Sequence, residues 1–160
     1  MNKKKKILYI EFFIVAAIIS MEIIFNIWQG SIYYNEKRIA KDKESYSVSG
    51  FSATTKDIEG YRLTYSKISG DCLMWRLEPE KETEITFNYD SELYKGKFKV
   101  VLINLDKQET INILEGSEEG TKTIRLTGDR YVIKFVGKDA AGELEFSAEN
   151  NKDIKVSNAS

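Results

Sequence analysis

A run of 22 residues near the N-terminus, Ile7 to Trp28, limits more than any other feature how this chain can fold. At 1.5 Å per residue, a helix of this length spans roughly 33 Å, which matches the hydrocarbon core of a bilayer. Isoleucine, phenylalanine, leucine and valine dominate the run, and only Glu11 and Glu22 carry charge within it. Neither glutamate lies at the centre, where the cost of insertion is largest. We therefore expect the run to span a membrane.

The flanks of this run favour a retained signal anchor over a cleaved signal peptide. The run exceeds the 7–15 apolar residues of a signal peptide, and no small-x-small cleavage site follows it. The single cysteine, Cys72, lies far beyond the run, which excludes a lipid-attachment site. The lysines at positions 3–6 hold the N-terminus inside by the positive-inside rule. The sequence predicts a single-pass protein of the cell membrane, with a cytoplasmic tail (1–6), a transmembrane anchor (7–28) and an extracytoplasmic C-terminal domain.

Glu11, Glu22 and Asn26 lie on one face of the predicted helix, because eleven residues are close to three helical turns. A polar stripe on a single span is typical of contact with another helix, here one from a membrane or envelope protein. The alternative is that both glutamates bend toward the nearest membrane interface and contact no partner. The sequence leaves both interpretations open.

The composition of the rest of the chain excludes several classes of function. The first 28 residues carry four lysines and two glutamates, so residues 29–160 have a net charge of about −3 against −1 for the whole chain. This balance argues against a nucleic-acid partner and against electrostatic capture of an anionic surface. The sequence contains no histidine, the commonest general base and a common zinc ligand. We expect no enzyme activity, no metal site and no cofactor.

The segment 29–44 has no sustained apolar face, and we interpret it as a stalk or linker. From Ser45 onward, polar and apolar residues alternate over many short runs, which is typical of half-buried strands. The run KGKFKVVLINLD is apolar on both faces from Val100 to Ile103, as expected of a central or sheet-switching strand. The other runs are SYSVSGF, YRLTYSKI, CLMWRLE, ETEITFNY, ETINIL, TKTIRLTG, RYVIKFVG and GELEFSA.

Short pairs with turn propensity, Gly70-Asp71, Asp106-Lys107 and Gly128-Asp129, separate these runs. We therefore predict an all-β fold, an antiparallel β-sandwich that is jelly-roll-like with eight or nine strands, over residues 45–149. The polar tail, 150–160, either frays or adds a short edge strand.

The segment GTKTIRLTGDRYVIKFVGKDAAGELEFSAE and the upstream YKGKFKVVLINLDKQ resemble the closing strands of a group of bacterial proteins. These are small membrane-anchored or lipid-anchored extracytoplasmic β-sandwich proteins of Gram-positive bacteria, and the resemblance covers about residues 94–149. It implies a sandwich outside the membrane and brings no catalytic residues with it. The chain lacks the N-terminal lipobox cysteine of the lipoprotein members, so the resemblance favours the membrane anchor.

Aromatic residues are the chief candidates for ligand contact. Trp75, Phe87 and Tyr89 have the parity of core residues, whereas Tyr94, beside the expected turn at 90–92, is the candidate for an exposed aromatic. We expect Cys72 to be buried, with a disulfide between chains as the alternative. Carboxylates cluster at Asp90/Glu92, Glu115/Glu118/Glu119 and Asp139/Glu143, which we interpret as solvated turns.

These observations favour a non-catalytic accessory or interaction module at the bacterial cell surface. The alternative is a carbohydrate-binding or cell-wall-binding module. A glycan binder of this fold should expose several coplanar aromatic side chains, and this criterion separates the two interpretations.

Overall fold

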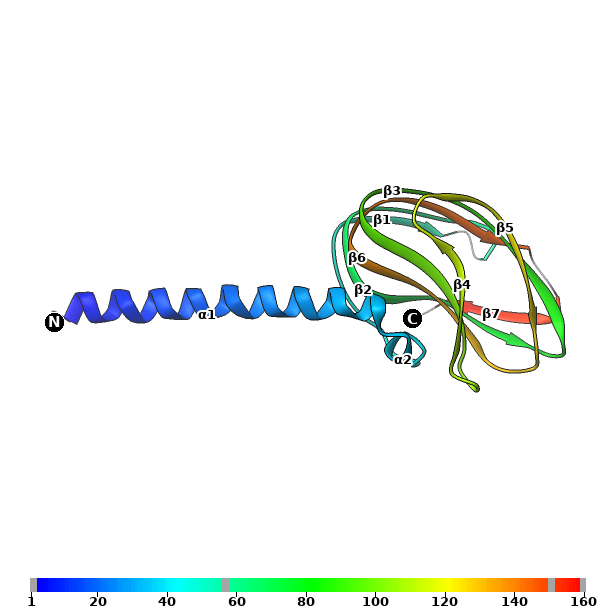
Figure 1. The fold of residues 1–160 in the computed structure, drawn as a ribbon, viewed down its shortest axis with the longest axis horizontal. Helices are drawn as coiled ribbons and strands as arrows, with labels where there is room; N and C mark the ends of the chain where they lie inside the picture. Colours follow the sequence, from blue (N-terminus) through cyan, green and yellow to red (C-terminus); the bar gives the residue numbers. More distant parts are fainter. Residues whose placement is uncertain (1–2, 56–57, 150–151, 159–160) are drawn as a thin grey trace.

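The computed structural model describes residues 3–55, 58–149 and 152–158. One long helix, α1 (Lys3–Ser31), enters one end of a β-sandwich (Figure 1). A 3-10 turn, η1 (Ile32–Tyr34), and a short helix, α2 (Glu36–Ile39), follow it. The strands are β1 (Ser45–Thr55), β2 (Tyr61–Pro79), β3 (Thr83–Asn104), β4 (Glu109–Glu115), β5 (Glu118–Leu126), β6 (Tyr131–Ala148) and β7 (Ile154–Asn158). The predicted antiparallel β-sandwich is confirmed.

Helix α1 is long and apolar enough to cross a membrane, and its most apolar stretch of 18 residues has a mean hydropathy of 2.1. Its large apolar side chains, among them Phe12, Phe13 and Ile24, are exposed. A span near an N-terminus fits a membrane anchor and also fits a signal sequence. Retention of the helix and its orientation stay predictions from the sequence, and residues 1–2 of the cytoplasmic tail lie outside the described residues.

The sandwich is a single antiparallel sheet that folds back on itself, because three long strands, β2, β3 and β6, each run through both layers. The layer that residues 32–40 do not cover, which we call the distal layer, has the order β1, β2, β6, β3, β5. The proximal layer has the order β7, β2, β6, β3, β4. With each long strand counted as two segments, this is the jelly-roll order with β1 and β7 added as edge strands.

The bends in the long strands explain why the structure has seven strands where the sequence predicted eight or nine. YRLTYSKI and CLMWRLE join as β2, and the runs of β3 and β6 join in the same way. The predicted turn at Gly70-Asp71 is therefore wrong, because β2 continues through it. Gly70 has φ +106°, and a Cβ there would lie 2.0 Å from the carbonyl oxygen of Ser45. A glycine that permits a sharp bend gives the same sequence signal as a turn.

The core lies between the two layers and is rich in aromatic rings. Phe146 stacks against Phe87 with ring centroids 5.5 Å apart and lies 5.6 Å from Trp75. These three side chains and Tyr89 are buried, as their parity in the sequence predicted. The tail also contributes to the sheet, because β7 pairs with β2 and forms one edge of the proximal layer. Residues 150–151 and 159–160 of the tail lie outside the described residues.

Residues 29–44, expected to be a stalk, lie against the outer face of the proximal layer and form what we call the connector. Ile32, Tyr33 and Ile39 are buried there. They pack in a second hydrophobic cluster against Leu73, Val101, Ile103, Val132 and Val136. The connector explains why the run Val100 to Ile103 is apolar on both faces, because one face meets the core and the other meets the connector.

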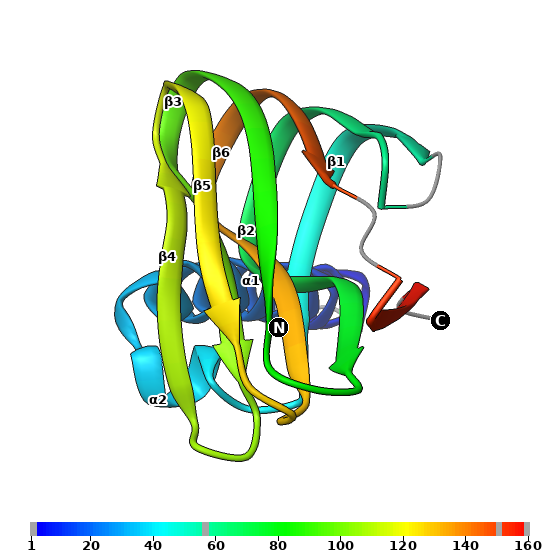
Figure 2. The same ribbon diagram turned by 90° about the vertical axis from the view of Figure 1, so that its right-hand side faces the viewer.

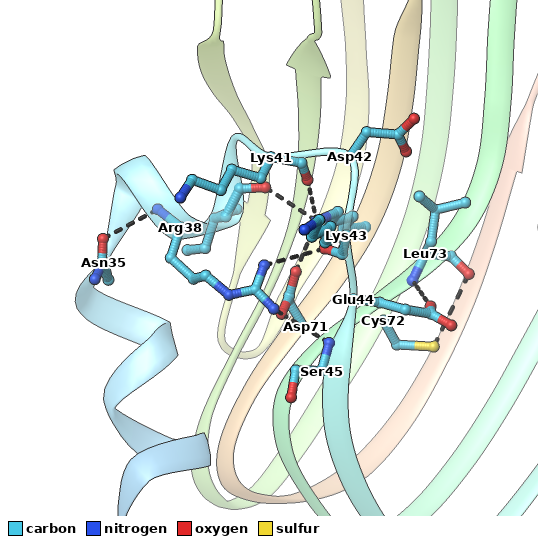
Figure 3. Close-up of polar contacts among 12 residues, drawn as sticks. Asn35, Arg38, Lys41, Asp42, Lys43, Glu44, Ser45, Asp71, Cys72 and Leu73 are labelled. Atoms are coloured by element: carbon cyan, nitrogen blue, oxygen red, sulfur yellow. Dashed lines mark hydrogen bonds and ion pairs between the residues drawn. The ribbon is translucent and has the colours of Figure 1, made fainter.

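Polar contacts around the buried carboxylate of Asp71 fasten the connector to the sheet (Figure 3). The Lys134 ammonium lies 2.6 Å from Asp71 Oδ2 and donates hydrogen bonds to the carbonyl oxygens of Ile39, Lys41 and Lys43 at 3.1, 2.8 and 2.5 Å. Both charged side chains are completely buried. Burial lowers the pKa of Lys134, and the Asp71 carboxylate opposes that shift. The three carbonyl oxygens that accept from Lys134 belong to the connector, and the Arg38 guanidinium of the connector lies 3.7 Å from Asp71 Oδ1. These contacts hold the connector in one position on the sheet.

Candidate functional site

The outer face of the distal layer carries a hollow of about 770 Å³. The connector covers the outer face of the proximal layer, whereas the outer face of the distal layer is open to solvent at the hollow. In Figure 2, which looks along α1, the distal strands β5 and β3 lie in front of the helix. The hollow is lined by Thr54, Glu59, Gly60, Tyr61, Arg62, Asn88, Tyr89, Asp90, Glu119, Gly120, Thr121, Glu145, Phe146 and Ser147.

Strand alternation places the polar side chains of the hollow, because every second residue of a strand points away from the core. The register aligns them in rows across the sheet. Arg62 lies opposite Glu145, Glu145 opposite Asp90, and Asp90 opposite Glu119. The next row brings together Ser147, Asn88 and Thr121, with Thr121 Oγ1 donating a hydrogen bond to Asn88 Oδ1 at 2.8 Å. The result is a surface of carboxylate, amide and hydroxyl groups at strand spacing.

The hollow carries an excess of negative charge. Arg62 forms an ion pair with Glu145, and Asp90 and Glu119 lie beyond that pair in the same row. Like charges directly opposite each other on neighbouring strands destabilise a sheet by roughly 0.2–1 kcal/mol. The neighbouring carboxylates of Asp90, Glu119 and Glu145 repel one another, and together they offer several hydrogen-bond acceptors to any ligand that enters the hollow.

Tyr94 lies on the same face, four residues along β3 from Asp90 and two rows beyond the hollow, which it does not line. Its side chain is 59 % exposed, as the sequence predicted, and its hydroxyl donates a hydrogen bond to Glu92 Oε2 at 3.4 Å. Partial desolvation and the carboxylates of Glu143 and Glu92 raise the pKa of this hydroxyl. The other exposed aromatic side chains among the described residues of the domain are Tyr34, Tyr46 and Phe51. The described residues therefore do not provide the row of coplanar aromatics that the sequence criterion asked for.

The acidic clusters that the sequence assigned to turns belong mainly to this face, and that assignment is wrong for most of them. Asp90 and Glu92 lie within β3, Glu119 within β5 and Glu143 within β6, with Glu143 directly opposite Glu92. Sequence reasoning missed Arg62, Asn88 and Glu145. Their signal was present as the polar half of each alternating run, but register was needed to show that they meet.

The three stripe residues lie on the part of α1 that precedes its first residue buried against the sandwich, Gln29. Glu11 and Glu22 are exposed. The Asn26 side-chain amide donates a hydrogen bond to the Glu22 carbonyl oxygen at 2.8 Å. Contact with a partner helix stays a prediction.

The remaining chemical groups give no catalytic arrangement within the part of the chain that the structure describes. Cys72 is partly buried and unpaired there, and burial, together with Glu44, raises its pKa to about 12. Ser147 lines the hollow without a hydrogen bond to a base, and Ser117 Oγ accepts one from the Leu93 amide. In residues 3–55, 58–149 and 152–158, no group of three or more acidic or cysteine side chains is placed to hold a metal ion.

No model of a known protein family matches this sequence, and no curated protein matches it. Among solved structures it is similar to Xyl-CBM35 in complex with a glucuronic acid-containing disaccharide, at 8 % identity and a TM-score of 0.39, covering 75 % of this chain and 86 % of that one. A mutant of the family 29 carbohydrate-binding module CBM29-2 complexed with mannohexaose shows 12 % identity and a TM-score of 0.36, covering 73 % and 82 %.

A family two carbohydrate esterase from Cellvibrio japonicus shows 10 % identity and a TM-score of 0.34, covering 72 % of this chain and 31 % of the esterase. At these TM-scores the similarity supports no argument about ligand or activity. The case for a function therefore depends on the hollow itself.

Proposed function

We propose that this chain is a membrane-anchored glycan-binding module whose distal hollow holds an uncharged or cationic saccharide. This was the alternative interpretation of the sequence, and the hollow is the observation that carries it. Carboxylate oxygens accept hydrogen bonds from sugar hydroxyls, and Asn88 supplies both a donor and an acceptor. Tyr94 supplies an exposed ring beside the hollow for stacking against a sugar ring.

The charge of the hollow sets the class of saccharide. Asp90, Glu119 and Glu145 face Arg62 as the cation in their row, so an anionic polymer would meet repulsion there. A neutral or amino-bearing sugar meets acceptors instead. Tyr94 is a single exposed ring, where a row of aromatic side chains would allow extensive stacking. Recognition of the saccharide therefore depends more on hydrogen bonds than on stacking, and we expect modest affinity.

The placement of the hollow supports a role at a surface. It lies on the layer opposite the connector, and α1 leads away from it (Figure 1). With α1 in a membrane and the N-terminus in the cytoplasm, the hollow would face outward from the cell. We propose that the module binds without catalysis, in agreement with the absence of histidine from the sequence.

The test is a glycan-binding screen with the full-length protein in lipid nanodiscs, followed by calorimetry on the best ligand. Asp90→Asn combined with Glu145→Gln should weaken binding by at least about tenfold, since each lost charge-assisted hydrogen bond removes roughly 1 kcal/mol or more. Glu80→Gln, which neutralises one carboxylate on a strand-connecting loop outside the hollow, should leave binding unchanged. Binding that the double variant leaves intact would refute the assignment to this hollow.

A second proposal rests on the polar stripe of α1. Glu11 and Glu22 are exposed on one face of the helix, and a partner helix would give them polar contacts inside the membrane. Glu11→Leu with Glu22→Leu should then reduce recovery of a membrane partner when the tagged protein is purified from native membranes. Ile14→Leu with Ile18→Leu is the matched control. If the glutamate variant recovers the same proteins as the control, the stripe has no such role.

A further inference from the structure

The sandwich follows the predicted span without a spacer. Gln29, one residue after Trp28, is 1 % exposed, and its Nε2 donates a hydrogen bond to Ser45 Oγ at 3.0 Å. Gly30 is buried against the stem of Lys138, so that a Cβ at Gly30 would lie 3.4 Å from Lys138 Cγ and 3.9 Å from Lys138 Cε. With a rise of 1.5 Å per residue, this contact lies about 3 Å beyond the end of the span.

That position lies inside the headgroup region of a bilayer. The headgroups on each side of the hydrocarbon core occupy roughly 5–8 Å. The surface of the sandwich around the end of α1 therefore lies at the level of the lipid phosphates. Its polar groups exchange part of their contact with water for contact with headgroups.

Two lysines occupy this surface in an arrangement that favours an anion. Lys97 on β3 and Lys138 on β6 lie directly opposite each other, and like charges in such pairs repel. The ammonium groups lie 5.2 and 4.8 Å from the centroid of the Tyr34 ring, which both share. In the described parts of the chain neither lysine has an ion-pair partner, while the nearby Asp139 pairs with Lys67 at 3.9 Å.

We propose that Lys97, Lys138 and Tyr34 bind the phosphate of an anionic lipid in the leaflet from which the sandwich emerges. The Lys138 ammonium lies 3.5 Å from the Tyr34 hydroxyl and donates a hydrogen bond to it. Both ammonium groups can also donate hydrogen bonds to phosphate oxygens, and an anion bound by both removes their mutual repulsion. The net charge of about −3 over residues 29–160 does not reveal this site, because it averages the two lysines with acidic residues elsewhere, among them those that line the hollow. The proposal requires α1 to span a membrane and does not depend on glycan binding.

The experiment measures lipid selectivity around the full-length protein. The protein is reconstituted in phosphatidylcholine vesicles that contain a spin-labelled phosphatidylglycerol or a spin-labelled phosphatidylcholine, and the immobilised fraction of each is determined by electron paramagnetic resonance. We expect a preference for phosphatidylglycerol that falls about threefold in Lys97→Gln with Lys138→Gln, in line with the attraction of single surface lysines to anionic lipid. The lysines at positions 3–6 also attract anionic lipid, but they are the same in every variant and do not affect the comparison.

Lys122→Gln with Lys155→Gln is the matched control, because it removes the same charge from β5 and β7, away from the end of α1. The proposal holds if the control keeps the wild-type preference and if inorganic phosphate does not compete. It is overturned if both double variants lose the preference equally, or if neither does. Circular dichroism of each variant checks that these exposed substitutions leave the fold intact.

Discussion

At the scale of single residues, Lys134 has the largest expected effect on stability. It has no exposed surface, and its ammonium is satisfied by one carboxylate and three carbonyl oxygens. Removal of Lys134 leaves the buried Asp71 carboxylate with only the longer contact to Arg38, at 3.7 Å, and the Ser45 amide to compensate its charge. We expect Lys134→Met to lower the free energy of unfolding by about 3–5 kcal/mol, as measured by urea denaturation.

Lys155→Met provides the comparison for that prediction. Lys155 is exposed and lies 3.9 Å from Glu78, so its loss should cost less than about 1 kcal/mol. Equal effects of the two substitutions would show that the buried pair contributes nothing special to stability.

A second residue-scale prediction concerns acid. Hydrogen bonds from Lys107, Thr127 and Asn104 hold the pKa of Asp129 well below its ordinary value of 3.8. The unfolded chain therefore binds this proton at higher pH than the folded protein. The stability that Asp129 contributes is complete above pH 3.8 and is lost as pH falls toward the folded pKa.

We expect Asp129→Asn to reduce the loss of stability between pH 5 and pH 2, as measured by urea midpoints across that range. Glu80→Gln makes the same chemical change elsewhere on the surface. The prediction fails if the acid sensitivity of Asp129→Asn matches that of the wild-type protein.

The thiol of Cys72 gives a third prediction. With its pKa raised to about 12, almost no thiolate exists at pH 8. Because the thiolate is the nucleophile, maleimide should modify the native protein at least about a thousandfold more slowly than the urea-unfolded protein, as followed by mass spectrometry. Rapid modification of the native state would instead show an accessible thiol and revive the interpretation of a disulfide between chains.

The residues show where alternation is a reliable guide and where it is not. It correctly placed Trp75, Phe87 and Tyr89 in the core, because each side chain lies on the face between the two layers. It placed Lys134 on a polar face, yet that side chain is buried. Alternation reports which face a residue occupies, and it cannot report that a distant segment covers that face.

At the scale of elements, the connector changes how the domain must be defined. Ile32 and Ile39 are seven residues apart, which is a helical spacing, but the positions between them on that face, Asn35 and Glu36, are polar. The segment therefore has no sustained apolar face that would identify it. The informative signal lay elsewhere, in the strand that is apolar on both faces from Val100 to Ile103. A strand with two apolar faces requires two covering layers, and here the second is the connector.

Removal of the connector should therefore damage the sandwich. We expect a fragment of residues 29–160 to be monomeric with a cooperative urea transition. A fragment of residues 45–160 should aggregate or unfold at lower urea, because it exposes the outer apolar face of the proximal layer and leaves Lys134 without its carbonyl partners. Size-exclusion chromatography and urea titration compare the two fragments, and equal stability would show that the connector is dispensable.

At the scale of the whole molecule, helix and sandwich form one body. The end of α1 contacts β1, β2 and β6, and the connector continues that contact across the proximal layer. Spin labels at Ile27→Cys and Lys122→Cys, in a Cys72→Ser background, should give one narrow distance distribution in nanodiscs. A label pair at Glu80→Cys and Lys122→Cys, both on the sandwich, gives the reference width.

Insertion of a short Gly-Ser segment after Trp28 should broaden the distribution between helix and sandwich and leave the reference pair unchanged. A distribution that is already broad in the wild-type protein would contradict a rigid junction.

With α1 spanning a membrane, as we propose, the missing spacer after Trp28 would make the thickness of the membrane a determinant of where the hollow faces. A span of roughly 33 Å stands nearly upright in a bilayer of that thickness, and in one of about 27 Å it must tilt by roughly 35° to keep its apolar length covered. With no joint to absorb the tilt, the sandwich turns through the same angle. Lipid composition would thereby adjust the direction of the proposed binding surface without any change within the domain.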